Sequence, residues 1–238
     1  MLKNTIRIGF LMILLIFLVG CDYYNTDIRD FETKEFSSER YEFIKKNIRI
    51  KKLNKQFKSG GIESFSISES GKIAISLDKN SDISIFNIYD NQGNFQYGYE
   101  YSKNGIVGIY WIDDKLAIYS SRGGLVFTID ENNNILNIQK VIDNSRNDEF
   151  SSFLQFQNEI VVDNNKYIIS KNPGPFPINI ITSPSKLVKI EAHGNQTVIF
   201  DNYINEHFKD IFITLFFYFF IGVGVSVYMW EHKNYCKK

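Results

Sequence analysis

The chain has 238 residues, with equal numbers of acidic and basic side chains and only two cysteines. This length gives room for one sizeable domain in addition to membrane segments. The chain carries no long cluster of Lys and Arg, which argues against a nucleic-acid partner.

The first 21 residues combine a basic start with an apolar run from Ile8 to Gly20. Thirteen apolar residues suit the core of a signal peptide better than a full membrane span. The run ends in Leu18-Val19-Gly20-Cys21, which resembles the lipobox of bacterial lipoproteins, where the chain is cut before a Cys that carries lipid. Cys21 is therefore a candidate lipidation site, and an uncleaved anchor helix is the alternative that the residues leave open.

Residues 22–46 are polar and aromatic, with no sustained period of two or of 3.6. We predict a tether with a short helix over residues 38–46, which would let a domain stand away from the membrane. Residues 48–57 alternate enough to form one further hairpin before the main domain.

Three later segments are similar to one another, since each has a polar turn, then a Lys, then a short apolar strand rich in Ile. They are Gly71–Ser76, Asp114–Ser120 and Asn165–Ser170. We expect another strand before each of them, at residues 62–68, 106–112 and 150–156.

A second repeated motif, an acid followed by x-x-Gly/Asn-Asn, connects the apolar segments of each unit. It occurs as Asp90–Asn94, Asp130–Asn134 and Glu191–Asn195. The fourth position of such a hairpin turn needs a positive φ, which Gly adopts freely and Asn tolerates. The acid can accept hydrogen bonds from the turn amides.

Each unit would then hold four short strands in about 40 to 50 residues, and this arrangement resembles a β-propeller blade. The resemblance implies an all-β repeat domain with about three propeller-like, four-stranded antiparallel units. Propellers usually close with four to eight blades. We therefore expect an open arc or a domain that closes by pairing with another chain, because open arcs leave strand edges unpaired.

All four prolines of the chain lie in residues 172–185, within the last unit. Three of them should make this loop stiff and extended, and its apolar side chains would form an exposed patch if left uncovered. The loop either covers an open edge of the arc or forms a contact surface for another protein. The residues of this candidate interaction loop are Pro173, Pro175, Phe176, Pro177, Ile178, Ile180 and Ile181.

Ile211–Trp230 holds twenty residues without a charge, the length needed to cross roughly 30 Å of hydrocarbon as a helix. Basic residues flank both apolar stretches and the middle of the chain is mildly acidic, so both ends are expected in the cytoplasm. Cys21 and Cys236 then lie on opposite sides of the membrane, and no disulfide is expected. The expected divisions are a signal or anchor segment (1–21), a tether (22–46), the repeat domain (47–205), a transmembrane helix (209–231) and a cytoplasmic tail (232–238).

No catalytic motif of the common hydrolase, metalloprotease, nucleotide-binding or thiol type occurs in the sequence. His193 and His207 fall in a turn and beside the membrane, so a shared metal site is not expected. Asp143–Asp148 resembles the start of a calcium loop but lacks Gly at its sixth position, and Leu154 replaces the Glu at the twelfth. We therefore assign no catalytic, cofactor-binding or metal-binding residues.

We expect a membrane-anchored extracytoplasmic interaction module without enzymatic activity or cofactor, whose partner is a protein or a cell-wall polymer. A homo-oligomer is left open. The alternative is an accessory or sensory subunit of a membrane protein assembly. The sequence resembles small, uncharacterised membrane-anchored proteins of low-GC Gram-positive bacteria, and this resemblance implies a location but no chemistry.

The expected topology can be tested with an impermeant thiol reagent on intact cells. A cysteine introduced at Gln92 should be labelled, because the outer domain faces the medium. Cys236 should be labelled only after the membrane is permeabilised. Labelling of Cys236 alone on intact cells would overturn the orientation.

Overall fold

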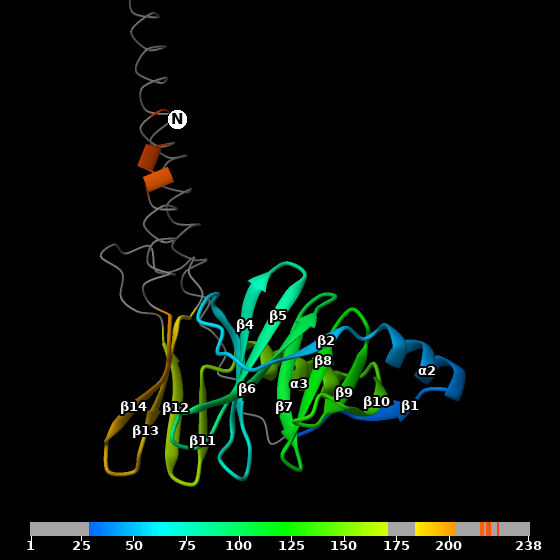
Figure 1. Cartoon of the computed structure of the whole chain (residues 1–238), viewed down its shortest axis with the longest axis horizontal. Coiled ribbons are helices and arrows are strands. Elements are labelled where there is room, and N and C mark those ends of the chain that lie inside the picture. The colour runs from blue at the N-terminus through cyan, green and yellow to red at the C-terminus, as the bar shows by residue number, and fades with distance from the viewer. Residues whose placement is uncertain (1–28, 171–183, 203–214, 217, 220–222, 224–238) are drawn as a thin grey trace, which may run out of the picture.

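A computed structural model of the chain describes residues 29–170 and 184–202, together with Leu215, Phe216, Tyr218, Phe219 and Val223 (Figure 1). The described residues form a β-rich domain with two helices, α2 (Ser38–Asn47) and α3 (Ser145–Phe156). Cys21, the candidate interaction loop and most of the predicted membrane span lie outside them. Within the part that is described, no helix is long and apolar enough to cross a membrane.

The domain contains three antiparallel sheets, and the strands of each sheet that follow one another in sequence also lie side by side. The first sheet contains β3 (Ile62–Ile67), β4 (Ile73–Asn80), β5 (Ile83–Tyr89) and β6 (Phe95–Ser102). The second contains β7 (Val107–Ile112), β8 (Lys115–Ser120), β9 (Leu125–Ile129) and β10 (Ile135–Val141). The third contains β11 (Glu159–Val162), β12 (Asn165–Ser170), β13 (Lys186–Ile190) and β14 (Gln196–Asp201). The predicted all-β domain with three four-stranded antiparallel units is confirmed.

The N-terminal segment adds a fifth strand to two of these sheets. β1 (Thr33–Glu35) pairs with β10, and β2 (Ile50–Leu53) pairs with β6. The described part of the predicted tether is therefore folded onto the domain, because its backbone pairs with an open edge and Phe31 is only 5% exposed. The hairpin expected at residues 48–57 is likewise wrong, since β2 pairs with a distant strand.

Helix α2 confirms the short helix expected near residue 38. The side chain of Ser37 caps it by accepting a hydrogen bond from the Arg40 amide at 3.4 Å. The helix exposes most of its surface and buries Ile44 against the domain. It joins β1 to β2 across the outer edges of the second and first sheets (Figure 1).

The strand expected at residues 150–156 is a helix instead. Asn144 caps α3 by accepting a hydrogen bond from the Asn147 amide at 2.8 Å. Phe150 and Leu154 are four residues apart and both are buried on one face of the helix. A short apolar run fits either period, and the capping residue decides between them here. The first strand of the third unit is β11, which begins after the helix ends.

The three sheets are stacked with the first sheet in the middle (Figure 1). One core lies between the first and second sheets and another lies between the first and third. A smaller core on the far face of the second sheet contains Phe31 together with Phe150 and Leu154 of α3. The spatial order is therefore third, first, second, although the chain forms them as first, second, third.

The repeated turns have the predicted conformation. The fourth residue of each motif has a positive φ, at 87° for Gly93, 69° for Asn133 and 85° for Gly194. In the first two turns the leading carboxylate, Asp90 or Asp130, accepts hydrogen bonds from two turn amides at 2.8–3.0 Å. The side-chain amide of Asn94 or Asn134 also donates to the same carboxylate, and this bond contributes most to holding the pKa of both carboxyls below its usual value.

The turn geometry predicts the cost of substituting these positions. Gly194→Val places a β-branched side chain at positive φ with open space around it, so the cost is local strain of roughly 1–3 kcal/mol. Gly93→Val should cost more, because the added Cβ would also lie 2.8 Å from Ile199 Cδ1. Asn133→Gly should be neutral or stabilising. Urea unfolding of residues 22–209, followed by Trp111 fluorescence, measures all three. Equal midpoints for Gly194→Val and the unchanged fragment would contradict the turn assignment.

The cost of replacing a glycine inside a strand depends on its neighbours in space, which the sequence does not show. Gly98 and Gly108 lie inside strands, where the sequence pattern predicts that Ala costs little unless a neighbour packs closely. A neighbour does pack closely at both positions, because an added Cβ would lie 2.7 Å from the backbone oxygen of Phe86 at Gly98 and 3.0 Å from Leu154 Cδ1 at Gly108. Gly98→Ala should therefore destabilise the fragment as well.

Candidate functional site

Two hollows lie at opposite ends of the adjacent strands β3 and β7. One is a cleft at the ends of these strands, lined by residues 66–69 and 110–114 together with α3 and β11. The other is a smaller polar pocket at their beginnings, lined by Glu63 and Lys103. Residues from distant parts of the sequence meet in both.

The cleft has a volume of about 710 Å³ and mostly apolar walls. Tyr110 and Trp111 at the end of β7 form one wall, Phe153 and Leu154 of α3 another, and Ile160 of β11 a third. The indole of Trp111 is fixed by a hydrogen bond from Nε1 to the Ser66 oxygen at 3.2 Å. The cleft thus offers a preformed apolar surface of the kind that ligand sites use.

Gln157 supplies an unsatisfied polar group in the wall of the cleft. It follows α3, and its Nε2 donates a hydrogen bond to the Phe65 oxygen at 2.6 Å. The side chain is 7% exposed, and its Oε1 has no hydrogen-bond partner among the described residues. A buried acceptor without a partner costs about 1–3 kcal/mol. Because Oε1 itself has almost no accessible surface, a ligand in the cleft would gain this hydrogen bond only if the side chain turned toward it.

Acidic side chains surround the mouth of the cleft. Glu69, Asp113 and Asp114 line it, against one basic residue, Arg29. Asp113 and Asp114 form the β7–β8 turn, with φ values of 46° and 59°. Asp114 accepts a hydrogen bond from Ser70 Oγ at 2.8 Å, which lowers the pKa of its carboxyl. The mouth therefore carries excess negative charge at neutral pH.

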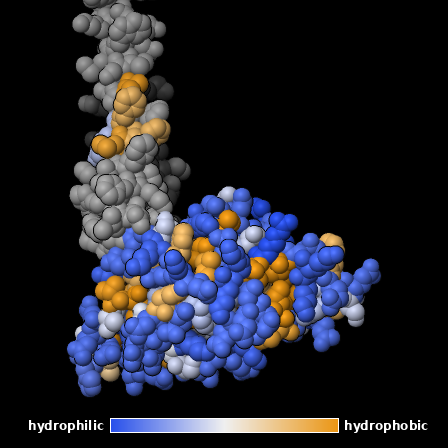
Figure 2. Space-filling view, viewed as in Figure 1, coloured by the Kyte–Doolittle hydropathy of each residue, from blue (hydrophilic) through white to orange (hydrophobic). Residues whose placement is uncertain are grey.

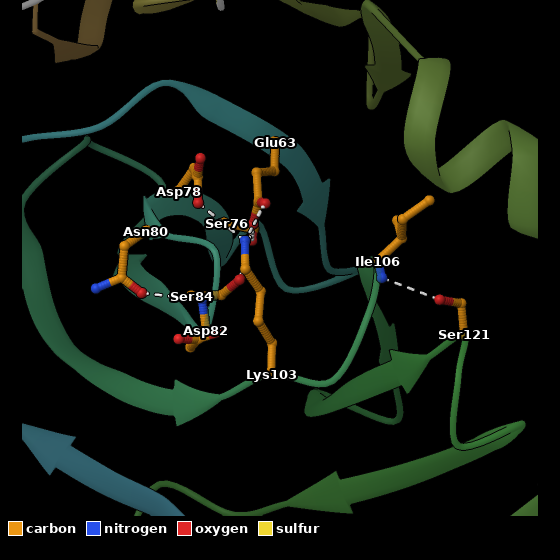
Figure 3. A network of polar contacts seen from close by, with 9 residues as sticks. All are labelled: Glu63, Ser76, Asp78, Asn80, Asp82, Ser84, Lys103, Ile106 and Ser121. Carbon is orange, nitrogen blue, oxygen red and sulfur yellow. Dashed lines mark hydrogen bonds and ion pairs between the residues drawn. The ribbon is translucent and has the colours of Figure 1, made fainter.

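The polar pocket has a volume of about 510 Å³ and surrounds an ion network in which the lysine is buried and its two carboxylate partners are partly exposed (Figure 3). Lys103 Nζ lies 2.7 Å from Glu63 Oε1 and 2.9 Å from Asp78 Oδ1, and its side chain is 8% exposed. The other oxygen of Glu63 accepts hydrogen bonds from Ser76 and Ser84, which are both fully buried. Burial alone would lower the pKa of Lys103, but the bonds to the two carboxylates outweigh it and the pKa is raised.

Each resolved shift moves the pKa of its group further from pH 7. Burial raises the pKa of Tyr89 to about 12, and burial beside Asp30 also raises that of Tyr110. The pKa of Asp114 falls, whereas that of Lys103 rises. Each of these groups therefore keeps one protonation state near pH 7.

Few of the residues singled out from the sequence lie in the described part of the chain. His193 is exposed in the β13–β14 turn, whereas Cys21, His207 and the candidate interaction loop lie outside that part. The pair Asp113 and Asp114, which the sequence alone presents as an ordinary solvated turn, lines the cleft. No group of three or more metal-ligating side chains occurs within residues 29–170 and 184–202. Trp111 and Gln157 were missed, because a single Trp in a strand and a Gln after a helix carry no local signal of a site.

The sequence matches no protein-family model, and no curated protein is detectably similar to it. The structure alone therefore describes the chain. It is a β-rich domain of three antiparallel sheets with a cleft that has apolar walls and an acidic rim.

The ion network predicts that replacing Lys103 destabilises the domain more than replacing Lys79. Lys103→Met should destabilise the domain by about 2 kcal/mol, because it leaves two carboxylates without their charged partner. Lys79→Met removes an ion pair to Glu100 whose side chains are 35% and 33% exposed, so the loss should be under about 1 kcal/mol. Equal losses in urea unfolding would contradict the role of the network.

The same network predicts a pH dependence. The folded-state pKa of Lys103 lies above the ordinary value of 10.5. Its stabilising contribution is therefore complete below pH 10.5 and is lost as the pH rises through the raised pKa. The difference between the unchanged protein and Lys103→Met should stay constant from pH 7 to 9 and shrink at higher pH.

Proposed function

We propose that this chain is a membrane-anchored, extracytoplasmic interaction module without enzymatic activity, and that it binds a segment of a partner protein in the cleft. The bound segment would combine apolar side chains with a Lys or Arg. The observation that carries the proposal is the cleft itself, with apolar walls, an unpaired buried acceptor and an acidic mouth.

Two features favour a protein segment over a cell-wall polymer. The walls are lined by Trp111, Phe153, Leu154 and Ile160, and such surface is better covered by apolar side chains than by a polar polymer. β11 is the edge strand of the third sheet, and three of its four residues line the cleft. An extended segment could therefore also pair with its backbone.

The membrane location is supported by the sequence and by the few described residues of the predicted span. Leu215, Phe216, Tyr218, Phe219 and Val223 are helical and between 44% and 66% exposed. At about 100° per residue these five positions cover about half of the helix circumference, and a broad, exposed apolar face agrees with a lipid-embedded segment. The excess of basic residues at both ends favours an outer location for the domain.

We also propose that the three units are blades of a short, propeller-like arc. Its support is that the first strands of two units, β3 and β7, lie side by side and that β11 contacts β3. Helix α3 packs on β3 and β7 between the second and third units. It would occupy the place where a further blade stands in a longer propeller.

Site-specific photocrosslinking in intact cells tests the binding proposal. A photoreactive residue at Val162, inside the cleft, should yield a protease-sensitive adduct. The same residue at Leu136, which is 43% exposed on β10 and outside the cleft, should not. Glu69→Gln combined with Asp113→Asn should reduce the Val162 adduct at least fivefold, because the acidic mouth attracts a basic segment.

The charge effect has a matched control. Glu39→Gln with Glu42→Gln removes the same charge from exposed positions on α2 and should leave the adduct unchanged. Equal adducts from Val162 and Leu136 would disprove the cleft as the site. An adduct that resists proteases but is digested by a wall hydrolase would identify a wall polymer instead of a protein.

A further inference from the structure

The three sheets differ at their outer edges. Each unit ends in a strand whose second edge needs a partner, namely β6, β10 and β14. β2 covers the edge of β6 and β1 covers the edge of β10. No strand pairs with the second edge of β14 among the residues that the structure describes. The third sheet is thus four-stranded where the others have five strands.

Residues 196–200 of β14 lack the charges and prolines that often protect an open edge. Natural edge strands carry Lys, Pro or other charges that prevent pairing with another chain. Residues 196–200 of β14 are Gln, Thr, Val, Ile and Phe, which are uncharged and mostly favour strands. Ile199 forms a bulge, because Val198 and Phe200 pair with the neighbouring residues Val188 and Leu187. This bulge leaves only a short stretch available for pairing.

An apolar row crosses the outer face of the third sheet and stops at this edge. Ile168, Val188 and Val198 are cross-strand neighbours in register. Val198 is the last of them and is 49% exposed. Figure 2 shows several apolar patches on a mostly hydrophilic surface, and one of them lies on the left, over the third sheet.

We infer that β14 pairs with β14 of a second copy of this chain, antiparallel and about a two-fold axis at Val198. This register places Val198 opposite its own copy and joins the two apolar rows into one of six residues. The paired stretch, Thr197–Ile199, has three residues, as does the pairing of β1 with β10. An isologous contact of this kind closes after two copies.

A second copy suits this edge better than the other faces of the domain. α3 and Phe31 cover the far face of the second sheet, and both faces of the first sheet are packed. Two copies therefore cannot close a larger ring through their second sheets. The third sheet combines an uncovered apolar row with an unpaired edge, so a single contact can cover both.

Disulfide crosslinking of the full chain in membranes tests this inference. Val198→Cys places two thiols opposite each other, with Cβ atoms about 5 Å apart, so mild oxidation should give a covalent dimer. Val161→Cys is the matched control. It lies on the same face, is 62% exposed, and is three strands, or about 14 Å, from β14. The Val198→Cys dimer should form at least fivefold faster, measured against the chain without an engineered Cys.

A measurement of mass complements the crosslinking. In mild detergent the unchanged chain and Val161→Lys should contain two copies, whereas Val198→Lys should contain one, because two Lys side chains would meet at the axis. The inference is overturned if the unchanged chain is monomeric, or if the two Lys variants have the same mass. Equal crosslinking rates, or a product whose mass is not that of two chains, would also overturn it. The outcomes for Val198→Cys and Val198→Lys do not depend on whether the cleft binds a partner, because Val198 does not line the cleft.

Discussion

The fold depends on the burial of the first sheet on both of its faces. Along β4, Ile73, Ala74, Ile75, Ser76 and Leu77 are each 0% exposed, and the alternating apolar side chains enter two different cores. Both faces of the first sheet are apolar and must be packed against another layer. The second sheet, which follows it in sequence, packs against only one of them. The third unit packs against the other, so the chain must return past the first sheet after it completes the second.

Helix α3 is the element that makes this return, and the cleft is a consequence of it. The helix passes the ends of β3 and β7 and leads into β11. Helix α3 does not completely cover the ends of β3 and β7. The apolar side chains there stay accessible and form the walls of the cleft. The acidic turn at Asp113 and Asp114 lies beside them because hairpin turns gather at the ends of strands.

The parts of the fold that the sequence predicted correctly depend on neighbouring residues. The acid-x-x-Gly/Asn-Asn turns were identified because one positive φ and one carboxylate decide their shape. β1 was missed and β2 was assigned to a local hairpin, because among the described residues each pairs with one strand that lies about fifty or more positions away. The apolar run of α3 was read with the wrong period, since Phe150 and Phe156 fit a strand as well as a helix. The cleft could not be predicted, because its residues converge only after the sheets stack.

The N-terminal segment also makes the domain sensitive to mechanical load. Phe31 contacts the rings of Tyr110 and Phe150, and Asp30 accepts a hydrogen bond from the Tyr110 hydroxyl at 2.8 Å. Asn147, at the start of α3, exchanges hydrogen bonds with the backbone of Glu32 at 2.8 Å. A pull on the chain ahead of Asp30 would therefore reach the walls of the cleft directly. It would load the pairing of β1 with β10 and draw Phe31 away from α3 before it reached the first and third sheets.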